Sequence, residues 1–109
     1  MEAKFARVNM IDFLSEEALE EVQNRYAKIR KKTYPGIEFT VWVRTGSQSM
    51  MTLSIYESEE ALLATTENHQ QLIASTADFV KDIFFYEGSV SGVASTLVTD
   101  GFVTFDTER

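Results

Sequence analysis

Hydrophobic residues dominate four short segments in a strand-like pattern: Phe5 to Ile11, Ile37 to Arg44, Met50 to Tyr56 and Phe84 to Ala94. Successive side chains of a strand point to opposite faces, so such segments suit strands of a sheet with at least one buried face. The polar run Thr45 to Gln48 predicts a loop that joins the second and third strands into a hairpin.

Two other stretches carry apolar residues at helical spacing. The first follows Ser15, a suitable N-cap, and begins with Glu16 and Glu17, whose charges favour a helix N-terminus. It should end near Lys32, just before the turn predicted at Tyr34-Pro35-Gly36. Its inward-facing residues should be Ala18, Leu19, Val22, Tyr26 and Ile29.

A second helix should begin after Ser58, which is again followed by acidic residues. The run from Thr65 to Asn68 is poor in helix formers, so we expect a kink or short break there. Beyond the break, a further helical piece should turn inward the residues Leu72, Ile73, Phe79 and Val80.

The order strand, helix, strand, strand, helix, strand predicts an α+β, ferredoxin-like βαββαβ fold. In this fold both helices cover one face of a four-stranded antiparallel sheet. Residues 1–109 are short enough for a single domain. Residues 96–109 form a C-terminal extension, either a local hairpin about Asp100-Gly101 or an arm that packs on a neighbouring subunit.

Division of the strands by alternate positions gives two sets of side chains. The first, called here the apolar face, is Ala6, Val8, Met10, Phe39, Val41, Val43, Met51, Leu53, Ile55, Phe84, Tyr86 and Val90. The second, called the mixed face, is Phe5, Arg7, Asn9, Ile11, Glu38, Thr40, Trp42, Arg44, Met50, Thr52, Ser54, Tyr56, Phe85, Glu87 and Ser89. We expect the helices to cover the apolar face and a second copy of the chain to cover the mixed face.

The polar groups of the mixed face allow two interpretations. They either satisfy one another across a dimer interface or line a small-molecule pocket, in which a few polar groups converge among apolar ones. In the second case Arg7, Arg44 and Tyr56 would hold an anionic or phenolic ligand.

Composition and charge narrow the choice of function. The chain has 17 acidic and 10 basic residues, a net charge of -7 that disfavours nucleic acid as a partner. Cysteine is absent and there is one histidine, so we expect no thiolate or all-histidine metal site. No segment has the length or composition of a signal peptide or membrane span, so a cytoplasmic protein without membrane contact is expected.

Three segments carry a resemblance to a known family. They are Lys4 to Asn9, the Tyr34-Pro35-Gly36 turn, and Leu53 to Leu62, where a strand ends in Tyr and a Ser-Glu-Glu-Ala-Leu helix start follows. Together they resemble the dimeric α/β-barrel superfamily, specifically antibiotic-biosynthesis-monooxygenase-like domains, over roughly residues 5–91. The resemblance implies two sheets paired face to face in a homodimer. It also implies oxidation of polycyclic phenols or degradation of haem without a conventional prosthetic group.

The resemblance assigns catalytic roles to two residues. Asn9 matches the first-strand Asn of the haem-degrading branch, but that branch's Trp and His positions fall near Thr65 and Ser75, which departs from its pattern. Relatives carry histidines close to His69, the side chain whose ordinary pKa best suits proton transfer at neutral pH, although a lone histidine also suits a surface or capping position.

We therefore expect a homodimeric barrel that binds a small hydrophobic or aromatic molecule and needs no cofactor. As a cofactor-independent monooxygenase, it would use Asn9 and Arg7 to polarise a substrate oxygen and His69 to shuttle a proton, with Trp42 and Tyr56 lining the pocket. The alternative is a non-catalytic dimeric binding or interaction module of the same fold.

Overall fold

The computed structural model of the protein describes residues 3–93, so the predicted extension at 96–109 lies outside the described residues. Its elements are β1 (Phe5–Phe13), α1 (Glu16–Thr33), β2 (Ile37–Arg44), β3 (Ser49–Tyr56), α2 (Glu59–Leu63), α3 (Thr66–Ser75) and β4 (Val80–Ser89). None of the helices found in this range is long and apolar enough to cross a membrane.

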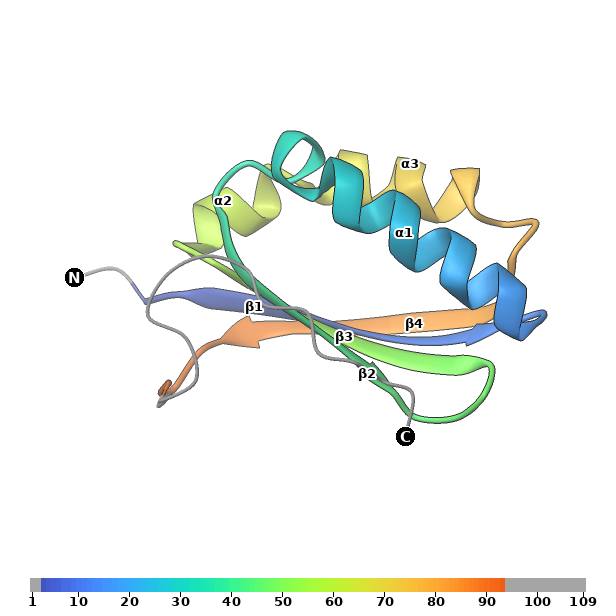
Figure 1. Ribbon diagram of the computed structural model, residues 1–109. Helices are drawn as coiled ribbons and strands as arrows, with labels where there is room; N and C mark the ends of the chain where they lie inside the picture. The colour runs from blue at the N-terminus through green and yellow to red at the C-terminus, as the bar shows by residue number, and fades with distance from the viewer. Residues whose placement is uncertain (1–2, 94–109) are drawn as a thin grey trace.

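The four strands form one antiparallel sheet in the order β2-β3-β1-β4. All three helices lie on one face of this sheet, and no helix of residues 3–93 covers the opposite face (Figure 1). The predicted α+β, ferredoxin-like fold is confirmed.

Serine caps set the starts of two helices, as predicted. Ser15 Oγ accepts a hydrogen bond from the Ala18 amide at 3.0 Å, and Ser58 Oγ accepts one from the Ala61 amide at 3.1 Å. The predicted break also exists, since α2 ends at Leu63 and α3 begins at Thr66. Between them the Leu62 carbonyl accepts hydrogen bonds from both the hydroxyl and the amide of Thr65, at 2.7 and 3.0 Å, which closes the end of α2.

The last strand differs from the prediction. It starts at Val80 rather than Phe84 and ends at Ser89 rather than Ala94. The helix before it stops early because the Thr76 hydroxyl donates to the carbonyls of Leu72 and Ile73, at 3.0 and 3.2 Å, which closes the last turn. Val80 is then free to pair with Phe13 of β1.

The helices cover the mixed face, which corrects the predicted arrangement of the two faces. Arg7, Asn9 and Tyr56 are buried beneath them. On the apolar face, Phe39, Phe84 and Tyr86 are 44, 49 and 65% exposed. The alternation was assigned correctly, but the set that faces the helices was not.

Pairing among polar groups explains how the mixed face can be buried. The Arg30 guanidinium on α1 donates to Thr40 Oγ1 at 3.4 Å. Thr40 and Ser54 share a hydrogen bond of 3.4 Å, and Tyr26 from α1 makes another of 3.4 Å to Ser54. Because α1 brings polar partners to this face, the desolvation cost of the strand hydroxyls is offset within one subunit.

The turn before β2 requires a glycine. Gly36 has φ +85°, Pro35 precedes it, and the Ile37 amide donates to the Tyr34 carbonyl at 3.2 Å, the features of a type II turn. A Cβ at Gly36 would lie 2.9 Å from Ala61 Cβ on α2. Gly36→Ala should therefore lower the free energy of unfolding by about 2 kcal/mol or more, because left-handed strain adds to this overlap. Urea unfolding measures the change.

Gly46→Ala is the matched control for this substitution. Gly46 also lies in a loop, but its added Cβ would meet Ser49 at 3.7 Å, an ordinary contact, without a positive φ. Equal stability losses in the two variants would contradict the role given to Gly36.

Candidate active site

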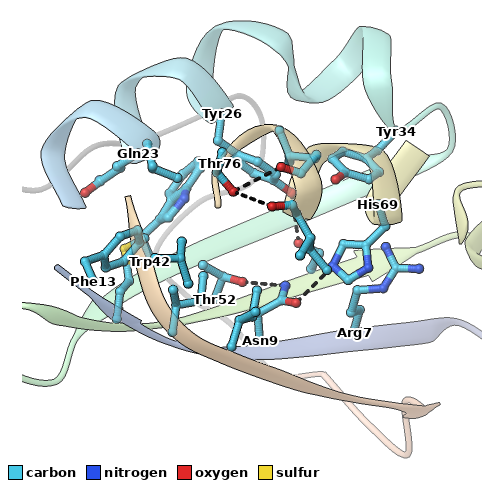
Figure 2. A pocket seen from close by; sticks show the side chains of 18 of the residues that line it. Arg7, Asn9, Phe13, Gln23, Tyr26, Tyr34, Trp42, Thr52, His69 and Thr76 are labelled. Carbon is cyan, nitrogen blue, oxygen red and sulfur yellow. Dashed lines mark hydrogen bonds between the residues drawn. The ribbon is translucent and has the colours of Figure 1, made fainter. Parts of the chain in front are cut away.

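A partly open cavity of about 60 Å³ lies between the mixed face of the sheet and the helices (Figure 2). Five of the predicted site residues line it: Arg7, Asn9, Trp42, Tyr56 and His69. Arg44 does not line it, although it lies on the same face, and its Nε and Nη2 are buried without a hydrogen-bond partner in the described structure. The cavity therefore belongs to a single subunit and is not enclosed between two sheets.

Asn9 and His69 form the polar centre of the cavity. Asn9 Nδ2 donates to Thr52 Oγ1 at 2.9 Å, which directs its Oδ1 to His69 Nε2 at 3.0 Å (Figure 2). In this amide orientation Nε2 carries the proton of the neutral imidazole and Nδ1 is its basic nitrogen. The contact joins β1 to α3, across 60 positions of sequence. Sequence reasoning selected both residues without predicting that they touch.

Burial controls the protonation of His69. His69 is 6% exposed and lies inside α3, so it occupies neither a surface nor a capping position. Desolvation, and secondarily the Arg7 charge, lower the pKa of His69 from 6.5 to about 4. At neutral pH the imidazole is therefore uncharged and able to accept a proton. Its ring lies edge-on to Phe85 at 4.7 Å between centroids.

Arg7 places a buried positive charge at the cavity wall. Its Nε donates to Glu87 Oε2 on β4 at 2.8 Å, and its Nη1 donates to Tyr56 Oη at 3.5 Å. The guanidinium carbon also lies 5.7 Å from the centroid of the Tyr56 ring. These contacts hold the guanidinium in place while Nη2 is left without a hydrogen-bond partner.

Two tyrosines of the cavity were not selected from the sequence. The sequence pattern predicts only that Tyr26 lies on the inner face of the first helix and that Tyr34 lies in the turn that follows it. Their rings lie 5.6 Å apart, and Tyr34 is 6.4 Å from the His69 ring. Burial raises the pKa of Tyr34, and it raises that of Tyr56 to about 12, so both hydroxyls keep their protons at neutral pH. The sequence signal that could have identified Tyr34 as a site residue is its phenol group, which directly precedes the Pro35-Gly36 turn.

The other end of the cavity is mainly apolar, with Gln23 as a polar side chain beside Phe13 and Trp42 (Figure 2). Phe13 and Met50 are buried there, and Trp42 packs edge-on against Tyr26 at 5.7 Å between centroids. Phe13 and Trp42 lie at the opposite end from Arg7 and Tyr34 (Figure 2). Within residues 3–93 no three His, Asp or Glu side chains gather in a way that would hold a metal ion. The site can thus bind an apolar body with a polar end.

Comparison with known proteins finds solved structures that share this fold. No protein-family model matches the sequence, and neither does any curated protein. Solved structures do match. A dimeric ferredoxin-like protein from an uncultured marine organism has a TM-score of 0.64 and 20% identity, over 90% of this chain and 95% of that one.

Two enzymes are also among the matching structures. The cofactor-independent oxygenase SnoaB from Streptomyces nogalater has a TM-score of 0.69 and 11% identity, over 84% of this chain and 96% of its own. A monooxygenase of Streptomyces coelicolor in complex with nanaomycin D has a TM-score of 0.67 and 10% identity, over 85% and 92%. The chain shares the ferredoxin-like fold of these structures. At identities of 10 to 20%, the likeness shows the fold alone, and it gives no information on the chemistry of the site.

Proposed function

We propose that the protein is a homodimer whose subunits each bind a small hydrophobic or aromatic molecule and oxidise it as a cofactor-independent monooxygenase. The observation that carries this proposal is the buried Asn9–His69 hydrogen bond at the wall of a cavity with one apolar end. A neutral, desolvated imidazole fixed by an amide is suited to proton abstraction from a substrate held beside it.

The chemistry needs a CH₂ group made acidic by a conjugated carbonyl oxygen, such as that of the keto tautomer of a phenol. His69 takes the proton, and the guanidinium of Arg7 stabilises the negative charge that develops on the oxygen. The carbanion passes electrons to O₂ and a C–O bond forms, which after protonation gives a hydroperoxide. Loss of water leaves a carbonyl, so that CH₂ and O₂ become C=O and H₂O. The substrate supplies all four electrons.

The homodimer is supported by the apolar face. Phe39 and Val43 on β2 and Phe84 and Tyr86 on β4 lie on it, each at least 39% exposed, and exposed apolar residues gathered on one face favour association. Structural relatives described as dimeric ferredoxin-like proteins favour a second copy as the partner.

A non-catalytic binding module is the second candidate, and the pKa of His69 favours it. An imidazole with a pKa of about 4 is a weak base in the empty cavity. A developing oxyanion beside His69 would offset the Arg7 charge and raise that pKa, so catalysis requires the substrate to strengthen its own base.

Oxygen consumption and product mass spectrometry with hydroxylated aromatics of one to three rings test catalysis. Asn9→Ala and His69→Ala should each lower the rate by about 100-fold or more, the usual contribution of a positioned acid–base group. Gln70→Ala, at an exposed neighbouring position, should leave the rate unchanged. Binding without turnover would favour the non-catalytic module, and full activity in both cavity variants would remove these residues from the mechanism.

A further inference from the structure

Two buried hydrogen-bond donors in the cavity have no partner in the described structure. They are Arg7 Nη2 and the Tyr34 hydroxyl, and each residue is 1% exposed. Buried donors are nearly always satisfied, and an unsatisfied one costs about 1–3 kcal/mol. Two such groups on the wall of one cavity therefore indicate an acceptor that enters from outside the protein.

The neighbours of Arg7 fix the direction of its free donor. Glu87 takes the Nε side and Tyr56 takes Nη1, so these two contacts leave Nη2 open. The guanidinium is also held near the Phe85 ring, 5.9 Å from its centroid. With the group restrained in this way, little side-chain entropy is lost when Nη2 binds an acceptor.

The charges on this wall favour an uncharged or partly charged oxygen over a full anion. The Glu87 carboxylate, 2.8 Å from Arg7 Nε, already balances the Arg7 charge, and it would repel a ligand carboxylate bound beside it. Tyr34 offers a neutral donor because burial keeps its hydroxyl protonated. A phenolic or carbonyl oxygen meets both conditions, and it becomes a stronger acceptor if negative charge develops on it.

The size of the cavity limits the body that carries this oxygen. About 60 Å³ exceeds the space of one water but is below the roughly 150 Å³ of a cavity that holds benzene. One ring fits if the partly open wall yields, whereas several fused rings require a much larger rearrangement. The apolar end, with Phe13 and Trp42, lies where such a ring would extend from Arg7 and Tyr34 (Figure 2).

We propose that Arg7 Nη2 and the Tyr34 hydroxyl form an oxygen-binding subsite, and that the ligand is a single-ring aromatic compound with a phenolic or carbonyl oxygen. This inference rests on the proposed function, in that it takes the cavity to be the ligand site. It adds Tyr34 as a specificity-determining residue and excludes large polycyclic compounds.

Titration of the full-length protein with phenol and toluene tests the subsite, since the two differ by a hydroxyl in place of a methyl group. Phenol should bind at least 10-fold more tightly than toluene. Tyr34→Phe should weaken phenol binding about 3- to 10-fold, the effect of one lost hydrogen bond, and leave toluene binding unchanged. Tyr86→Phe, which removes an exposed hydroxyl, should alter neither.

Tyr34→Phe also has a readout that needs no ligand. Because the Tyr34 hydroxyl has no hydrogen-bond partner among residues 3–93, the urea midpoint of the variant should be unchanged or higher. Equal affinities for phenol and toluene, with no effect of Tyr34→Phe, would show that water alone satisfies the donors and would overturn the subsite while leaving an apolar pocket. If neither compound binds, the proposed small-molecule site fails as well.

Discussion

Phe84→Lys is expected to raise the dissociation constant of the proposed dimer at least 100-fold. Phe84 is 49% exposed on the apolar face, next to Tyr86 on the same strand. Burial of a phenylalanine contributes roughly 1.5–3 kcal/mol, and a two-fold symmetric interface contains the residue twice. The lysine adds the cost of desolvating two ammonium groups. Sedimentation velocity over a range of protein concentrations measures the shift from dimer to monomer.

Leu63→Lys is the matched control. Leu63 is 56% exposed, but it lies on α2, in the helix layer on the other side of the sheet. This variant should dissociate at the same concentration as the wild type. A wild-type chain that is monomeric at tens of micromolar, or equal dissociation of the two lysine variants, would contradict the placement of the interface on the apolar face.

The stability of the protein should fall on acidification through His69. The unfolded chain protonates this imidazole near pH 6.5, whereas the native state holds it neutral until about pH 4. Between these values the unfolded state binds more protons, so the free energy of unfolding decreases as the pH is lowered. From about pH 7 to about pH 4.5, His69 alone should remove about 2–3 kcal/mol of stability.

Comparison with His69→Gln isolates this contribution, because acidic residues titrate in the same range in both proteins. The chain has one histidine, so no other imidazole contributes. Urea unfolding at both pH values should show a smaller loss for the variant, by about 2–3 kcal/mol. Parallel losses would mean that native His69 titrates at its ordinary pKa and is not desolvated.

The element order was predictable from the sequence because its signals are local. Ser15 and Ser58 mark helix starts, and the Tyr34-Pro35-Gly36 turn separates α1 from β2. The start of β4 was missed because Phe79 and Val80 suit a helix as well as a strand, and the choice depends on pairing with distant β1.

The orientation of the sheet was not predictable by the same means. Alternation separates two faces, but it does not say which one the helices cover. The composition of the apolar face suits an interior, whereas Arg7 and Asn9 on the mixed face need partners if they are buried. Their compensation comes from Glu87 and His69, roughly 60 or more positions away, which no local pattern reveals. Asn9 and His69 could therefore be selected from the sequence, but their contact could not be predicted.

Because the cavity lies under the helices of one subunit, the proposed ligand site and the proposed dimer interface lie on opposite faces of the sheet. Every residue that lines the pocket lies between the helices and the sheet of one chain, whereas the proposed dimer contact lies on the other face of the sheet. A variant with polar residues in place of the exposed apolar ones on the outer face of the sheet should therefore keep the whole pocket as a monomer.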